Sequence, residues 1–230
     1  KSEIISGIQF YKIYNSSKTK TQSSNYLRDS TWVDIYNSSF INSSRNQVYH
    51  KSKLVVGVEN LPYKSLLEPI LGNLLLDFGG TVMTRATQTN RSVFKTKSNA
   101  LVAPVICYES MYGEFMTDYV RNGAQLIAII TNDGWWGNSP GHKQLLSYSR
   151  LRSIELRRSI VRSANTGISA VINEKGDIIN SIEYEKNGII NDKISISNKL
   201  TFYAKYGDFI SRISLFFFII IFLFYFAKKK

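Results

Sequence analysis

The C-terminal part of the chain contains an apolar run that limits the fold more than any other feature. Ile213–Ala227 is almost uninterrupted hydrophobic sequence, and a lysine tail over 228–230 follows it. Backbone groups inside a bilayer must be hydrogen-bonded within the segment, so such a run folds as a helix. Extended back to Phe209, it can cross roughly 30 Å of hydrocarbon with Arg212 at the interface. We predict a transmembrane helix over 209–227; the alternative is a buried core helix.

The lysine tail also predicts an orientation. Lysine clusters beside a membrane helix tend to remain cytoplasmic. This tendency places a domain over 1–208 on the other side of the membrane, with the helix over 209–227 and a cytoplasmic tail over 228–230. In a bacterium, we therefore expect an inner-membrane protein with a periplasmic domain.

Composition excludes several kinds of chemistry. The chain has 230 residues, enough for one substantial core, but only one cysteine. A single cysteine excludes an intramolecular disulfide framework and zinc sites made of several cysteines, so we expect no metal and no cofactor. The net charge of +12 suits nucleic acid or acidic lipid. No recognition motif accompanies the basic residues, so we expect no nucleic-acid partner.

Cys107, that single cysteine, directly follows the apolar run Leu101–Ile106. The run is rich in β-branched residues, which predicts a buried strand that delivers Cys107 to its carboxyl end. Tyr108 and Glu109 come next, so a thiol and a carboxylate leave the same strand end. An isolated free cysteine is often only a small core residue, and the neighbouring motifs must decide between that role and catalysis.

Apolar runs and helical spacing alternate along the rest of the chain. The patterns predict helices after Cys107 and over 142–158, and strands over 4–11, 32–36, 124–131, 160–163, 168–172 and 178–182. This succession indicates a layered α/β or α+β domain. In the second helix we expect an inward apolar face and mostly solvated arginines; the face is Leu145, Tyr148, Leu151 and Ile154, and the arginines are at 150, 152, 157 and 158. The segment 63–99 is expected to form a lid or connection.

Two further segments carry polar and aromatic residues near predicted strand ends. Between Tyr49 and Pro62, Lys51 and Glu59 bracket an apolar piece in which Gly57 permits a tight backbone path. Taken alone, this segment is most simply a solvated loop.

The second of these segments is the loop 132–141, which holds Trp135 and Trp136 among glycines. Two adjacent tryptophans in a glycine-rich loop suggest an aromatic wall beside a pocket. A purely structural aromatic cluster is the alternative.

Together, these motifs resemble the nitrilase superfamily and, more narrowly, the apolipoprotein N-acyltransferases. The resemblance covers roughly residues 30–215, and its most specific parts are Pro104–Glu109, Thr131–Gly137 and Arg150–Ser169. It implies an α+β fold, a nitrilase-like αββα sandwich followed by a C-terminal transmembrane helix.

The resemblance also implies site residues. Cys107 corresponds to the nucleophile, Lys51 to the triad lysine and Glu59 to its supporting glutamate, and Glu109 is expected to help hold that lysine. Lys51 can stabilise the oxyanion of a tetrahedral intermediate. The expected substrate-binding residues are Asn37, Tyr108, Trp135 and Trp136.

The implied reaction transfers a fatty acyl group from a phospholipid, through a thioester on Cys107, to the amine of a diacylglyceryl-cysteine on a bacterial apolipoprotein. A monomer at a membrane is expected. The family's general-base glutamate and N-terminal membrane helices are not matched here, so the resemblance implies a C-terminal part that is inactive or impaired alone. The alternatives are an amidase acting on small carbon-nitrogen substrates and a non-catalytic remnant that binds lipid or lipoprotein.

Overall fold

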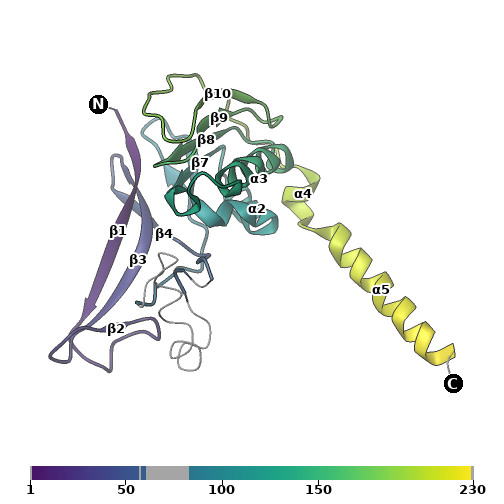
Figure 1. Cartoon of the computed structure of the whole chain (residues 1–230), viewed down its shortest axis with the longest axis horizontal. Coiled ribbons are helices and arrows are strands. Elements are labelled where there is room, and N and C mark those ends of the chain that lie inside the picture. The colour runs from purple at the N-terminus through teal and green to yellow at the C-terminus, as the bar shows by residue number, and fades with distance from the viewer. Residues whose placement is uncertain (1, 57, 61–82, 229–230) are drawn as a thin grey trace.

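The computed structural model describes residues 2–56, 58–60 and 83–228 (Figure 1). Its first strands form an antiparallel sheet, here called the N-terminal sheet, of β1 (Ile4–Tyr14), β2 (Asn25–Tyr26), β3 (Trp32–Asn42) and β4 (Gln47–His50). β1 pairs with β3 along its whole length. The strands predicted over 4–11 and 32–36 are therefore confirmed, and both are longer than predicted.

The later strands form the main sheet, whose order is β10-β9-β8-β7-β6-β5. Its strands are β5 (Phe94–Lys95), β6 (Leu101–Ile106), β7 (Leu126–Thr131), β8 (Ile160–Ala164), β9 (Ser169–Ile172) and β10 (Ile178–Ile182). β6, β7 and β8 run parallel, so their carboxyl ends meet at one edge. Ligand sites of open α/β sheets lie at that edge, and here it brings together three segments far apart in sequence.

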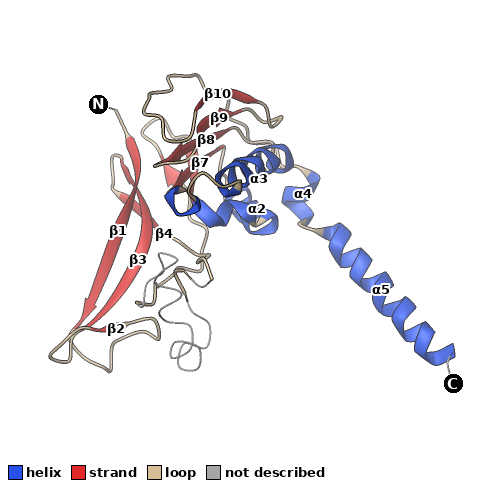
Figure 2. Cartoon of the chain, viewed as in Figure 1, coloured by secondary structure: helices blue, strands red, loops and turns tan. Residues whose placement is uncertain are grey.

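Two helices, α2 (Gly113–Arg121) and α3 (Gly141–Leu156), lie on one face of the main sheet (Figure 2). The core between them includes Val105, Ile127, Met116 and Leu156. The helix predicted after Cys107 begins with a 3-10 turn, η1 (Cys107–Met111), before α2. The α+β fold with mixed sheets and helices is as predicted; among the described residues, helices cover the main sheet, and the outer face of the N-terminal sheet is uncovered (Figure 2).

The inward face of α3 differs from the predicted one. Leu145 is buried, but Tyr148, Leu151 and Ile154 are 37–41% exposed. The buried face instead consists of His142, Leu145, Leu146, Ser149, Arg152, Ser153 and Leu156. Small serines on this face let the helix pack closely.

The expectation that the arginines near the end of α3 are solvated is wrong for two of them. Arg158 is 1% exposed, and its guanidinium donates to the carbonyls of Ala124 at 2.7 Å and Lys199 at 2.8 Å. Arg152 is 4% exposed and pairs with Glu155 at 3.0 Å. A buried charge costs less when it is hydrogen-bonded or ion-paired; among the described contacts Arg158 relies on backbone carbonyls and Arg152 on Glu155.

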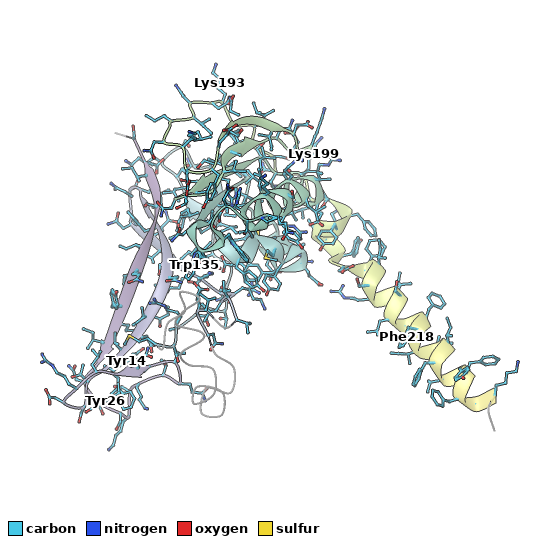
Figure 3. All side chains as sticks on the ribbon, viewed as in Figure 1. Tyr14, Tyr26, Trp135, Lys193, Lys199 and Phe218 are labelled. Carbon is cyan, nitrogen blue, oxygen red and sulfur yellow. The ribbon has the colours of Figure 1, made fainter. Side chains whose placement is uncertain are left out.

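The chain leaves the domain through α4 (Phe202–Tyr206) and continues into α5 (Phe209–Lys228), which projects away from it (Figure 1). α5 has a mean hydropathy of 2.3 over its apolar window and is long enough to cross a membrane. Beyond its first turn its described side chains are exposed on all sides of the helix, Phe218 among them (Figure 3). Arg212 fastens its first turn to the domain by pairing with Glu114.

Some sequence predictions lie outside the described residues. These are the tight backbone path at Gly57, most of the predicted lid or connection (61–82) and the last two lysines (229–230). The described remainder of the lid segment carries only the short strand β5.

Candidate active site

A cavity of about 1080 Å³ lies where the carboxyl ends of β6, β7 and β8 meet the N-terminal sheet. Its walls come from both sheets and from the loops that follow the parallel strands. The predicted site residues that line it are Asn37, Lys51, Glu59, Cys107, Tyr108, Trp135 and Trp136. The structure therefore brings together every predicted site residue except Glu109 on the surface of one cavity.

Cys107 occupies a sharp turn between β6 and η1. Its φ is +50°, a left-handed conformation that costs a non-glycine residue roughly 1–2 kcal/mol. The backbone there is held by Ser110, whose Oγ donates to the Cys107 carbonyl at 2.8 Å. The turn leaves the thiol half-buried at the cavity, and this position favours a reactive role over that of a filler in the core.

Lys51 and Glu59 form a buried ion pair in the wall of the cavity that Cys107 also lines. The ammonium of Lys51 lies 2.9 Å and 2.7 Å from the two carboxylate oxygens of Glu59, and the side chains are 2% and 6% exposed. The amide of Asn37 donates to Oε1 of Glu59, and the backbone N–H of Val55 donates to Oε2 at 2.8 Å. Glu59 thus fixes the ammonium at the cavity wall, and the structure uses the predicted substrate-binding residue Asn37 to hold Glu59.

Glu109 lies behind the cavity wall and is fully buried. Its Oε1 accepts hydrogen bonds from the Tyr49 hydroxyl and from the Ser52 N–H, both at 2.6 Å, and its Oε2 accepts from the Ile106 N–H at 2.9 Å. Burial raises the pKa of Glu109, and these hydrogen bonds oppose part of that rise. The positive charge of Lys51 also lowers the pKa of Glu109, although the described contacts include no hydrogen bond between them, so a role of Glu109 in holding the lysine stays a prediction. Its hydrogen bonds hold the backbone on either side of the site.

Aromatic rings form the mouth of the cavity. Tyr108 lies edge-to-face against Tyr112 with ring centroids 5.1 Å apart. Trp135 and Trp136 are half-exposed on the 3-10 turn η2 (Gly134–Trp136) and line the cavity. Trp135 lies on the side of the domain that faces the N-terminal sheet (Figure 3). This placement gives the cavity the aromatic wall that the glycine-rich loop suggested.

Sequence reasoning missed the contribution of β1 to this cavity. Ser6, Gly7, Ile8 and Gln9 line one side of it. A Cβ on Gly7 would lie 3.3 Å from the Ile130 methyl, so glycine allows β1 to approach the main sheet closely. A glycine inside an apolar strand pattern was the available signal.

Arg85 also lines the cavity and was not predicted. Its Nε is buried and makes no hydrogen bond within the described part of the chain. Nothing in the sequence around it distinguishes Arg85 from a solvated arginine. For metal ligation, the described residues contain no group of three or more His, Cys, Asp or Glu side chains.

Comparison with known proteins identifies the family. Residues 20–198 match the model of the carbon-nitrogen hydrolase family. The chain belongs to the carbon-nitrogen hydrolase family. A carbon-nitrogen hydrolase from Helicobacter pylori G27 has a similar structure, with a TM-score of 0.51 at 10% identity, covering 67% of this chain and 55% of that one. This likeness concerns the fold alone.

Curated relatives within the family carry a more specific name. The chain is 32% identical over 172 residues to the apolipoprotein N-acyltransferase of Shewanella oneidensis, covering 75% of this chain and 32% of the relative. It is 37% identical over 177 residues to that of Bradyrhizobium diazoefficiens, again covering 75% and 32%. The chain spans about a third of the length of these relatives.

Proposed function

We propose that this chain carries the acyl-accepting thiol of an apolipoprotein N-acyltransferase. The observation that carries the proposal is the shared cavity of Cys107, on its left-handed turn, and the buried Lys51–Glu59 pair. The names of the curated relatives and the membrane-length helix α5 support it, because both substrates of such an enzyme are lipids or lipid-modified proteins.

In the proposed reaction, the Cys107 sulfur attacks the carbonyl carbon of a phospholipid ester. Lys51 stabilises the oxyanion, the ester C–O bond breaks, and the lysophospholipid leaves with a proton. The α-amine of a diacylglyceryl-cysteine on an apolipoprotein then attacks the thioester, forming an amide and returning the thiol. Tyr108, Trp135 and Trp136 are proposed to contact the acyl donor.

The general base is not assigned among the described residues. Glu59 is the only carboxylate that they contribute to the cavity surface, and both its oxygens are occupied by Lys51, Asn37 and Val55. We therefore expect the 230-residue chain alone to acylate Cys107 slowly or not at all.

The proposed arrangement has a periplasmic domain over 1–208, a membrane span over 209–227 and a cytoplasmic tail over 228–230. Phospholipid donors and apolipoprotein acceptors then reach the cavity from the outer surface of the bacterial inner membrane. We expect the protein to act as a monomer without a cofactor.

The test is to trap the thioester. The chain, alone and joined to the part of the Shewanella oneidensis relative that it does not match, is incubated with phospholipid in detergent, and intact-mass spectrometry measures acyl addition that hydroxylamine removes. The joined form should acylate, and its Cys107→Ser variant should not. Ammonia release from small amides without phospholipid-dependent acylation would refute the proposal and favour an amidase.

A further inference from the structure

The aromatic wall of the cavity is fastened by a buried ion pair outside the proposed catalytic group. We propose that Asp133 and Arg162 are positioning residues that set the place of Trp135 and Trp136, and so determine how well the cavity accepts a long alkyl chain. The positioning stands on geometry alone, and only its relevance to acyl donors rests on the proposed function.

The pair is buried, and hydrogen bonds hold both of its side chains, although Nε of Arg162 is buried without a hydrogen-bond partner among the described residues. Nη2 of Arg162 lies 2.6 Å from Oδ2 of Asp133, and the two side chains are 1% and 0% exposed. Oδ1 of Asp133 accepts a hydrogen bond from the Thr131 hydroxyl at 2.7 Å, and Nη1 of Arg162 donates to the Ile168 carbonyl. These contacts tie the start of the tryptophan loop to β7, β8 and the turn before β9.

Asp133 is connected to the two tryptophans through the backbone. It is the residue before η2, and its carbonyl accepts the N–H of Trp136 at 3.1 Å. Neither indole N–H of Trp135 or Trp136 donates a hydrogen bond within the described part of the chain. The position of both rings therefore depends on the backbone that carries them and on their packing.

Two glycines leave the space that this arrangement needs. A Cβ on Gly167 would lie 2.1 Å from Oδ2 of Asp133, so the turn between β8 and β9 closes directly over the carboxylate. A Cβ on Gly141 would lie 2.6 Å from the indole of Trp136, so that ring rests on the first residue of α3. A methyl group at either place must move the ion pair or the ring.

The experiment uses the full chain in detergent micelles, with Trp32→Phe so that tryptophan emission reports only the loop. Gly141→Ala and Gly167→Ala displace the wall, and Asp133→Asn removes the pair. Ser147→Ala, on an exposed part of α3, is the matched control. The probes are methyl and decyl methanethiosulfonate, which modify Cys107 by the same chemistry and differ only in chain length.

The glycine variants should lower the ratio of decyl to methyl rates about tenfold, the effect of losing contact with one or two methylene groups. The methyl rate should not change, the tryptophan emission should shift to the red, and Ser147→Ala should match the parent. Asp133→Asn should lower the ratio in the same way. Should it fail to fold, Gly167→Ala still decides the question because its methyl group displaces the Asp133 carboxylate, whereas Gly141→Ala shows only that the position of the ring matters.

An unchanged ratio, or an equal fall for both reagents, overturns the proposal. The readout needs no acyl transfer, so these outcomes are independent of whether the chain is an acyltransferase. Conversely, a wall that selects for chain length in a protein that never forms an acyl-enzyme would refute only the proposed function.

Discussion

Glu59→Gln tests whether the buried Lys51 ammonium depends on the charge of Glu59 for its stability in the folded protein. The replacement keeps the shape but removes the charge that faces an ammonium only 2% exposed. In either orientation the amide NH₂ also faces the Lys51 ammonium, which now donates to both oxygens of Glu59, and it faces a second donor as well, either the Asn37 amide or the Val55 N–H. Breaking a buried ion pair from one side costs about 3–5 kcal/mol, because the remaining charge is left without compensation.

A loss of this size in the free energy of unfolding should lower the melting temperature clearly. For a domain of this length, each kcal/mol lowers Tm by roughly 2–4 °C, so we expect Tm to fall by roughly 6–20 °C. Circular dichroism in detergent measures it, with the exposed Glu183→Gln as control. Adding Lys51→Met to Glu59→Gln should recover part of the loss, because the double variant no longer buries an unpaired ammonium.

The reasoning is refuted if the free energy of unfolding of Glu59→Gln lies within about 0.5 kcal/mol of that of Glu183→Gln, which is the range of ordinary surface substitutions. It is also refuted if the double variant is less stable than Glu59→Gln. Either result would mean that water or another group compensates the ammonium.

Three further predictions follow from burial and backbone geometry. Because burial raises the pKa of Glu109, the folded state binds its proton more tightly than the unfolded state, so stability should fall as pH rises from the ordinary glutamate range to the raised pKa. Glu109→Gln should remove this slope in melts across that range. Arg158→Ala should cost about 2–4 kcal/mol in the same melts, since it removes charged hydrogen bonds to four carbonyls. Arg157→Gly should instead raise stability by about 0.5–1 kcal/mol, because Arg157 ends α3 at φ +50°.

The parts of the fold that were predicted correctly are those that apolar runs and turn residues mark in the sequence. Leu101–Ile106 is a buried strand whose end presents Cys107, and the turn after α2 contains Gly123 with φ +93°. The face of α3 was predicted wrongly because hydropathy counts arginine and serine as outward-facing residues. Their burial depends on partners elsewhere in the chain, such as the carbonyl of Ala124 for Arg158, and a local pattern does not contain them.

The sequence also did not predict the left-handed turn at Cys107 or the hydrogen bonds of Glu109 to the backbone. These two features lie next to each other in the structure. One carboxylate accepts the N–H of Ile106, immediately before Cys107, and the N–H of Ser52, immediately after Lys51. A single buried group therefore ties together the backbone of the proposed nucleophile and that of the proposed oxyanion-stabilising lysine. Ile106 belongs to β6 of the main sheet and Ser52 follows β4 of the N-terminal sheet, so the Glu109 carboxylate links the two sheets directly behind the site.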